Sequence, residues 1–199
     1  MAEHYFTKRP HSSSRATRIV TLIQQRRFHF ESSAGVFSRT RIDPGTLALV
    51  EFMQLPAEGT VLDLGCGIGV VGIVVKSFHS LLSVCLSDVN ERAIRLAQQN
   101  AALNNVSVEI RSGEGLAPWN RQFDAILLNP PQHAGKEICF RLMTEAQCRL
   151  KTGGSLQIVV RRNKGGKSFS EQMELIFGNV TEMGKKKGYG VYRSIKREN

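Results

Sequence analysis

The stretch Val61-Leu62-Asp63-Leu64-Gly65-Cys66-Gly67-Ile68-Gly69 decides the fold class. The apolar residues of 60–64 predict a buried strand, and the alternating glycines predict a tight turn that a ligand can approach without meeting Cβ atoms. Ligands of open α/β sheets bind beyond the carboxyl ends of the strands, where this turn would lie. The stretch therefore predicts a nucleotide-type binding loop after the first strand of a parallel sheet.

Strand and helix signals alternate from residue 59 onward. The expected strands are 60–64, 81–86, 106–111, 123–128 and 156–160, followed by an antiparallel pair, 180–183 and 189–195. The expected helices are 91–103, 136–150 and 170–177, with an earlier one that Asp43 caps and Pro44 opens. This alternation indicates an α/β fold, a mostly parallel sheet with helices on both faces.

The amino-terminal part predicts a β-hairpin over 18–31, with 24–27 near its tip. We therefore divide the chain into a basic hairpin extension, 1–33, and one α/β domain, 34–199. The total of 199 residues suits one domain with an appendage. No apolar run approaches the roughly 18 residues of a membrane helix, and the start lacks the apolar core of a secretion signal. We expect a soluble, cytoplasmic protein.

Cysteine and charge patterns narrow the class further. The four cysteines form no C-x-x-C pair and no Cys/His cluster with zinc spacing, so we expect no metal. The 27 basic and 17 acidic residues give a net charge of +10. Segments 1–33 and 161–199 carry +4 and +6 of this, and the stretch between them is neutral. Two basic ends on a neutral body indicate a polyanion held beside a site, although solubility through net charge is the simpler alternative.

Two acids favour one class of ligand over another. Asp88 closes the second strand 19 residues after Gly69, where a carboxylate can accept both ribose hydroxyls. Gly67, Gly69 and Gly72 also match the dinucleotide pattern, so the glycines alone do not exclude NAD or FAD. Asp63, however, can accept from an ammonium group, which S-adenosylmethionine has and NAD lacks.

The fourth strand ends in Asn129-Pro130-Pro131. The prolines have no N–H and fix their φ angles, so this turn is stiff and presents carbonyl groups. The side-chain oxygen of Asn129 and the carbonyl of Pro130 can accept both hydrogens of a planar amine. The sequence therefore predicts a site for an amino-group nucleophile, with Asn129, Pro130 and Pro131 as the catalytic turn.

These motifs together resemble class I methyltransferases that use S-adenosylmethionine. Three further stretches resemble the small domain of prokaryotic ribosomal-RNA guanine-N2 methyltransferases: Gly35-Val36-Phe37-Ser38 with Asp43-Pro44-Gly45-Thr46, Asn129 to Gly135, and Gly190-Val191-Tyr192-Arg193. The resemblance covers about 4–195. It implies a Rossmann-like class I methyltransferase fold, a seven-stranded sheet with an antiparallel last strand, and in-line methyl transfer to nitrogen without a covalent intermediate.

The resemblance also implies a set of cofactor-binding residues: Asp63, Gly65, Cys66, Gly67 and Gly69 around the methionine part, Asp88 and Val89 at the ribose, Glu114 at the adenine, and Phe37, Thr46 and Asn129 lining the mouth of the site. Cys66 is expected to be a small loop residue and not a nucleophile. One position departs from the family pattern, because Gln132 stands where an aromatic residue usually stacks on the target base.

The expected acceptor is the amino group of guanine in ribosomal RNA. Candidate phosphate contacts are Arg26 and Arg27 at the hairpin tip, and Arg161, Arg162, Lys164 and Lys167 in a basic loop after the fifth strand. Lys185 to Lys187 is expected in a hairpin turn. Two alternatives stay open: the same chemistry on adenine N6 or a protein glutamine amide, and a cofactor-binding RNA module without catalysis.

Overall fold

A computed structural model describes residues 17–36 and 40–198. The strands are β1 (Thr17–Ile23), β2 (Arg26–Ser32), β3 (Gly59–Leu64), β4 (Leu82–Asp88), β5 (Glu109–Ser112), β6 (Phe123–Leu128), β7 (Leu150–Arg161), β8 (Thr181–Lys186) and β9 (Tyr189–Ile195). The helices are α1 (Pro44–Phe52), α2 (Val70–Phe78), α3 (Glu91–Leu103), α4 (Lys136–Arg149) and α5 (Gly166–Phe177), with 3₁₀ turns at Gln132–Ala134 and Arg162–Lys164.

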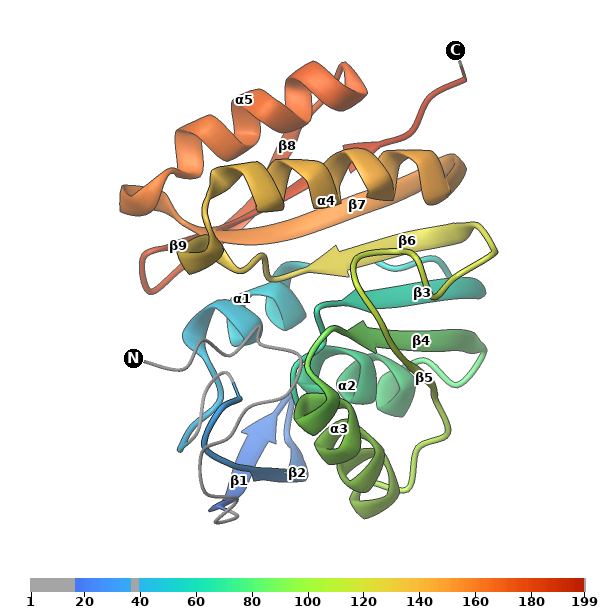
Figure 1. Cartoon of the computed structure of the whole chain (residues 1–199), viewed down its shortest axis with the longest axis vertical. Coiled ribbons are helices and arrows are strands. Elements are labelled where there is room, and N and C mark those ends of the chain that lie inside the picture. Colours follow the sequence, from blue (N-terminus) through green and yellow to red (C-terminus); the bar gives the residue numbers. More distant parts are fainter. Residues whose placement is uncertain (1–16, 37–39, 199) are drawn as a thin grey trace.

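Seven of these strands form one sheet in the order β5-β4-β3-β6-β7-β9-β8 (Figure 1). The pairs from β5 to β7 are parallel, and β9 runs antiparallel to both β7 and β8. The structure thus confirms the predicted sheet, with its reversed last strand. The carboxyl ends of β3, β4, β6 and β7 meet at one edge, which we call the carboxyl edge.

The sheet is buried on both faces, as its apolar strands require. Alternate residues such as Val61 and Leu127 pack with α1, α2 and α3 on one face. Their neighbours, such as Leu62 and Leu128, pack with α4 and α5 on the other face. Each helix that leaves the carboxyl edge therefore has a fixed place over the sheet.

The β1–β2 hairpin is the predicted one, with Gln24 and Gln25 both at positive φ in its turn. The side chain of Asn100 on α3 accepts from the amide of Glu31 at 2.7 Å and donates to its carbonyl at 3.0 Å. Phe28 and Phe30 are buried in the same core as α2 and α3. The hairpin therefore shares the hydrophobic core of the domain on which it lies.

Several element boundaries differ from the expectation. No element was assigned to Val70–Phe78, which is α2, because its almost continuous apolar run lacks a helical period. The third strand starts at Glu109 and not at 106, and β7 starts at Leu150, six residues early. The basic segment 161–168 is not one loop: Arg161 ends β7 and 166–168 form the first turn of α5. Lys185 and Lys186 belong to β8, so the turn holds only Lys187 and Gly188.

Candidate functional site

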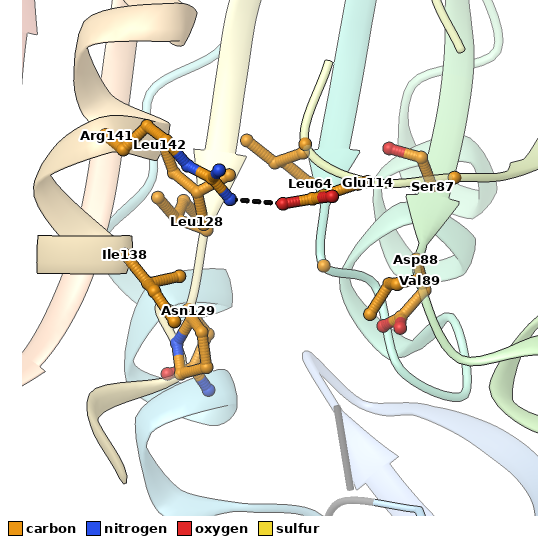
Figure 2. Close-up of a pocket in the computed structure, with 14 residues that line it drawn as sticks. Leu64, Ser87, Asp88, Val89, Glu114, Leu128, Asn129, Ile138, Arg141 and Leu142 are labelled. Atoms are coloured by element: carbon orange, nitrogen blue, oxygen red, sulfur yellow. Dashed lines mark hydrogen bonds and ion pairs between the residues drawn. The ribbon is translucent and has the colours of Figure 1, made fainter. Parts of the chain in front are cut away.

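A cavity of about 290 Å³ opens at the carboxyl edge (Figure 2). Six residues predicted from the sequence line it: Gly65, Asp88, Val89, Glu114, Asn129 and Pro131. A second cavity, of about 50 Å³, shares Gly65 and Asn129 with the first, and Thr46, Asp63, Cys66 and Gly67 also line it. The structure therefore brings most of the predicted cofactor set together, with Asn129 where the two cavities meet. Phe37 lies outside the described residues.

Hydrogen bonds hold the glycine turn, residues 65–69, against the carboxyl end of β4. The amide of Gly65 donates to the carbonyl of Ser87 at 2.8 Å, and that of Gly67 donates to a carboxylate oxygen of Asp88 at 2.8 Å. Gly67 has a φ of +54°, and a Cβ atom there would meet nothing within 4 Å. The turn is therefore an open cradle with room for a ligand at its surface.

Gly69 has a different role from the glycines before it. It lies at the amino end of α2 with a φ of +87°. A Cβ atom there would lie 3.1–3.2 Å from side-chain atoms of Ile73, Leu86 and Ala97. The residue lines neither cavity, so its small size serves the packing of α2 against α3 and β4.

Asp88, the last residue of β4, joins this strand to the glycine turn. Its other carboxylate oxygen accepts from the amide of Asn90 at 2.8 Å. Burial raises the pKa of Asp88, and the hydrogen bonds from Asn90 and Gly67 lower it in part. The amide of Val89 also donates to this carboxylate, and about one of its four acceptor positions is left for a further donor. The carboxylate can therefore still accept from a ribose hydroxyl in the cavity that it lines.

Asp63 is buried inside β3, with a relative exposure of 3%. It accepts from the amide of Gly72 at 2.9 Å, which fixes α2 to the strand. Burial raises the pKa of Asp63 to about 7, the Gly72 bond opposes this, and the negative charge of Asp88 adds to it. A cationic ligand in the smaller cavity would favour the ionised form of this buried carboxyl.

Cys66 is held as a neutral thiol. Burial raises its pKa well above the ordinary value, and the nearby charges of Asp63 and Asp88 raise it further. Because the thiolate is the nucleophilic form, these surroundings suppress its reactivity. The structure therefore agrees with a small residue that fills the loop.

The side chain of Asn129 is fixed by residues of α1 and its N-cap. Its Nδ2 atom donates to Oδ2 of Asp43 at 3.2 Å and to Oγ1 of Thr46 at 3.1 Å. In the ranges 17–36 and 40–198, no donor is placed on its Oδ1 atom. The Oδ1 atom thus keeps its acceptor capacity, in a residue that lines both cavities.

The proline turn beside Asn129 is an inverse γ-turn. Pro131 has φ −74° and ψ 73°, and the amide of Gln132 donates to the carbonyl of Pro130 at 2.8 Å. Pro130 itself is buried, and its carbonyl retains one lone pair. Gln132 is half-buried in the 3₁₀ turn that follows. The turn therefore uses one acceptor position of the Pro130 carbonyl internally.

An ion pair bridges the larger cavity. Nη2 of Arg141 on α4 lies 2.5 Å from Oε1 of Glu114 (Figure 2). Nε of Arg141 also lies 3.7 Å from Oε1 of Glu145. Both side chains of the first pair are more than half exposed. Glu114 therefore lines the cavity with one oxygen already engaged by Arg141, a residue that the sequence did not single out.

Basic residues from distant segments meet beside the site. The amide of Arg162 donates to the carbonyl of Gly188 at 3.0 Å, which joins the 161–164 segment to the β8–β9 turn. A Cβ atom on Gly165 would lie 3.6 Å from Cε of Lys136. Among the side chains that the structure describes in this region, the exposed cations are Lys136, Arg161, Arg162, Lys167 and Lys187, which we call the basic rim. The side chain of Lys164, also predicted as a phosphate contact, lies outside the described part.

The hairpin tip is not part of this rim. Nη1 of Arg26 donates to the carbonyl and hydroxyl of Ser77 at 2.6 Å, at the carboxyl end of α2. Its guanidinium also lies 5.1 Å from the centre of the Phe78 ring. Since α2 starts at the glycine turn, its last residues lie about 12 Å along the axis from the carboxyl edge. Arg26 and Arg27 are thus separated from the site.

Sequence reasoning missed two partners in the network around Asn129. Asp43 was identified only as a helix cap, which it is, since it accepts from the amide of Thr46 at 3.0 Å. Tyr189 donates its hydroxyl to Oδ1 of Asp43 at 3.4 Å and accepts from Nε of Arg161 at 2.9 Å. No local pattern joins residues 43, 129 and 189, so only the fold could reveal this arrangement.

The described residues show neither a membrane helix nor a metal site. Within 17–36 and 40–198, no helix is both long and apolar enough to span a bilayer. The same ranges contain no group of three or more His, Cys, Asp and Glu side chains arranged for a metal ion.

Comparison with known proteins identifies the family. Residues 27–193 match the methyltransferase small domain. The uncharacterised protein YbxB of Bacillus subtilis is 33% identical over 98% of this chain and all of its own length. Ribosomal RNA small subunit methyltransferase C of Shewanella loihica is 34% identical over 81% of this chain and 47% of its own. The chain thus spans about half the length of that relative.

A solved structure has the same fold. The 16S rRNA N2 G1207 methyltransferase (RsmC) of Thermus thermophilus, in complex with AdoMet and guanosine, superposes with a TM-score of 0.83. It is 24% identical and covers 94% of this chain and 52% of its own. The likeness confirms the Rossmann-like class I methyltransferase fold.

The residues of the two cavities fit S-adenosylmethionine. The open glycine cradle leaves space that a Cβ atom would fill, Asp88 retains acceptor capacity for a ribose, and the buried carboxyl of Asp63 suits an ammonium group. Together with the match over most of its length, this places the chain in the methyltransferase small-domain family, as an S-adenosylmethionine-dependent methyltransferase.

Proposed function

We propose that the chain methylates the exocyclic N2 amino group of a guanine in ribosomal RNA. The observation that carries the proposal is the free acceptor of Asn129, whose Nδ2 atom is engaged by Asp43 and Thr46 at the junction of the two cavities. An acceptor in this position suits a group that brings hydrogens, which an exocyclic amine does.

The contribution of the chain to the reaction is to orient the amine toward the methyl group. S-Adenosylmethionine supplies an electrophilic methyl group on a sulfonium. Asn129 Oδ1 and the remaining lone pair of the Pro130 carbonyl accept the two amine hydrogens, which turns the nitrogen lone pair out of conjugation with the ring. Alignment of this kind accelerates a direct displacement, in which the new C–N bond forms as the C–S bond of the sulfonium breaks and no covalent intermediate with the protein is made. The methylated nitrogen then releases one proton to solvent. The cysteine of the loop is not needed, in agreement with its neutral thiol.

The basic rim supports RNA as the carrier of the amine. Its cations come from four segments and lie beside the carboxyl edge, next to the strand that delivers Asn129. Cations grouped in this way suit the regularly spaced phosphates of a nucleic acid. The two named relatives of the small-subunit RNA methyltransferase group support the same substrate class. Gln132 is not aromatic and cannot stack on a base as an aromatic ring does, so the base must be tested directly.

The test is transfer of tritiated methyl from S-adenosylmethionine to small-subunit ribosomal RNA made by transcription, and in parallel to assembled small subunits that lack modification. The expected result is label in the RNA, recovered after nucleoside digestion as N2-methylguanosine. Label in N6-methyladenosine or in protein would overturn the base or the substrate class. Absence of label with intact cofactor binding would favour the non-catalytic alternative.

A second test concerns the rim. Replacing Lys136 and Lys167 by alanine should weaken RNA binding and reduce the slope of log Kd against log salt by about 1.4, or about 0.7 for each phosphate that the rim no longer neutralises. The matched control is Arg149→Ala with Arg197→Ala, which removes the same charge from exposed or half-exposed positions at the far end of α4 and β9. Equal slopes for both double variants would contradict a phosphate-binding rim.

A further inference from the structure

We propose that Asp43 is a positioning residue that sets which end of the Asn129 amide faces the amine that receives the methyl group. The inference rests on the proposed function and deepens it, because it explains how a side chain with two different ends comes to present only its oxygen. An amide turned by 180° would direct N–H groups at the amine hydrogens and prevent binding.

Thr46 alone cannot select the orientation. Its hydroxyl lies 3.1 Å from Nδ2 of Asn129, and a hydroxyl can either accept from the nitrogen or donate to the oxygen of a reversed amide. The carboxylate of Asp43 has no such freedom, because it only accepts. At 3.2 Å from Asn129, it therefore admits the nitrogen and rejects the oxygen.

Asp43 is itself held by three donors. The amide of Thr46 and Nδ2 of Asn129 share its Oδ2 atom, at 3.0 and 3.2 Å. The hydroxyl of Tyr189 reaches its Oδ1 atom at 3.4 Å. Nε of Arg161 donates to the same hydroxyl oxygen at 2.9 Å, which leaves the Tyr189 proton directed at Asp43. Every group around the carboxylate thus treats it as an acceptor.

The network also joins the site to the basic rim. Arg161 belongs to the rim, and its guanidinium lies 5.2 Å from the centre of the Tyr189 ring. A continuous series of hydrogen bonds runs from the exposed Arg161 through Tyr189 and Asp43 to the side chain of Asn129. Asp43 is therefore the point at which orientation is fixed.

Two variants separate this role from helix capping. Asp43→Ser keeps a good N-cap for α1 but is too short to reach Asn129 and Tyr189. Asp43→Asn keeps both: its carbonyl oxygen can accept from Thr46 and Asn129, and its NH₂ can donate to the Tyr189 oxygen. We expect Asp43→Ser to lower kcat about tenfold or more with the Kd for S-adenosylmethionine changed less than twofold, and Asp43→Asn to restore most of kcat.

A readout without RNA makes the inference independent of the substrate. The side-chain NH₂ signal of Asn129, identified by its loss in Asn129→Asp, should exchange slowly with solvent in the wild type and in Asp43→Asn, and fast in Asp43→Ser. Slow exchange in Asp43→Ser, or equal kcat losses in both variants, would overturn the role. Protection that depends on Asp43 in a protein that methylates no RNA would instead remove the proposed function and leave the positioning role.

Discussion

The two halves of the sheet hold their polar site residues by different means. On the β3–β4 side, the carboxylates of Asp63 and Asp88 accept from backbone amides of the loop and helix that follow the first strand. On the β6–β7 side, the amide of Asn129 is held by the side chains of Asp43 and Thr46, which come from a different part of the chain.

This difference separates two functions of one site. We call the β3–β4 side the cofactor half and the β6–β7 side, with Asp43, Thr46 and Tyr189, the acceptor half. Backbone amides hold the cofactor half through contacts only 9 and 21 residues apart, so that half is built within one short segment of the chain. The contacts of the acceptor half span 83 to 146 residues and depend on individual side chains. We therefore expect substitutions in the acceptor half to change the rate of transfer while cofactor binding stays intact.

The largest effect should come from Asn129→Ala. Without the acceptor oxygen, the amine is no longer turned toward the methyl group, and we expect kcat to fall about 100-fold or more, as for loss of one aligned polar group in other active sites. Single-turnover methyl transfer measures this directly. A loss below threefold would show that the two halves are not divided in this way.

The next effect is a dependence of cofactor affinity on pH. Because the pKa of Asp63 is about 7 and an ammonium ligand favours the carboxylate, binding releases a proton below that pH. The Kd for S-adenosylmethionine should therefore rise about fivefold from pH 7 to 6 and close to tenfold from pH 6 to 5, as followed by calorimetry. Asp63→Asn should bind weakly with a flat profile, and a flat profile in the wild type would contradict the assignment.

The same carboxyl has a linked effect on stability. The folded protein without cofactor holds the Asp63 proton up to about pH 7, whereas the unfolded chain releases it near the ordinary value of 3.8. Between these values the folded state binds more protons, so the contribution of Asp63 to the free energy of unfolding falls as pH rises. Urea unfolding of the wild type and Asp63→Asn at pH 4.5 and 7.5 checks the sign.

Two glycines of the same turn allow a smaller matched test. Gly67→Ala places a methyl group in the open cradle, so cofactor affinity should fall while the free energy of unfolding drops by about 1–2 kcal/mol for the positive φ. Gly69→Ala crowds Ile73, Leu86 and Ala97, which adds about 1–3 kcal/mol of overpacking but leaves the cradle open. Identical effects of both variants on affinity would contradict the distinction.

The smallest effect should follow Arg141→Ala. Its ion pair with Glu114 is largely exposed, and exposed pairs contribute about 0–1 kcal/mol. The Kd for S-adenosylmethionine should change by less than about fivefold, as measured by calorimetry. A larger loss would mean that Arg141 contacts the cofactor itself.

The cofactor half was predictable because its signals are local. The strand, the glycine turn and Asp88 lie within one segment of 30 residues, so spacing alone indicated that they would meet. The sheet and the N-cap of α1 were predicted for the same reason. The boundaries of β5, β7 and α5 were not, since glycines and polar residues at their ends hide a start that tertiary packing decides.

The acceptor half was predictable only in part. Asn129 was visible from its proline turn, but its partner Asp43 lies 86 residues away and Tyr189 lies 146 residues from Asp43. Separation along the chain also explains why the closeness of Lys136 to Gly165 and the contact of Arg26 with the end of α2 were not predicted. The number of basic residues can be counted from a sequence, but the fold is needed to see at which edge of the sheet they lie together.

One paired measurement tests the division most directly: the Kd for S-adenosylmethionine by calorimetry and the rate of methyl transfer to ribosomal RNA, for Asn129→Ala and Asp88→Ala beside the wild type. The account predicts that Asn129→Ala binds the cofactor within about twofold of the wild type but transfers almost no methyl. Asp88→Ala should lose cofactor affinity and recover its rate at saturating cofactor. Loss of cofactor binding in Asn129→Ala, or full transfer by it, would contradict the account.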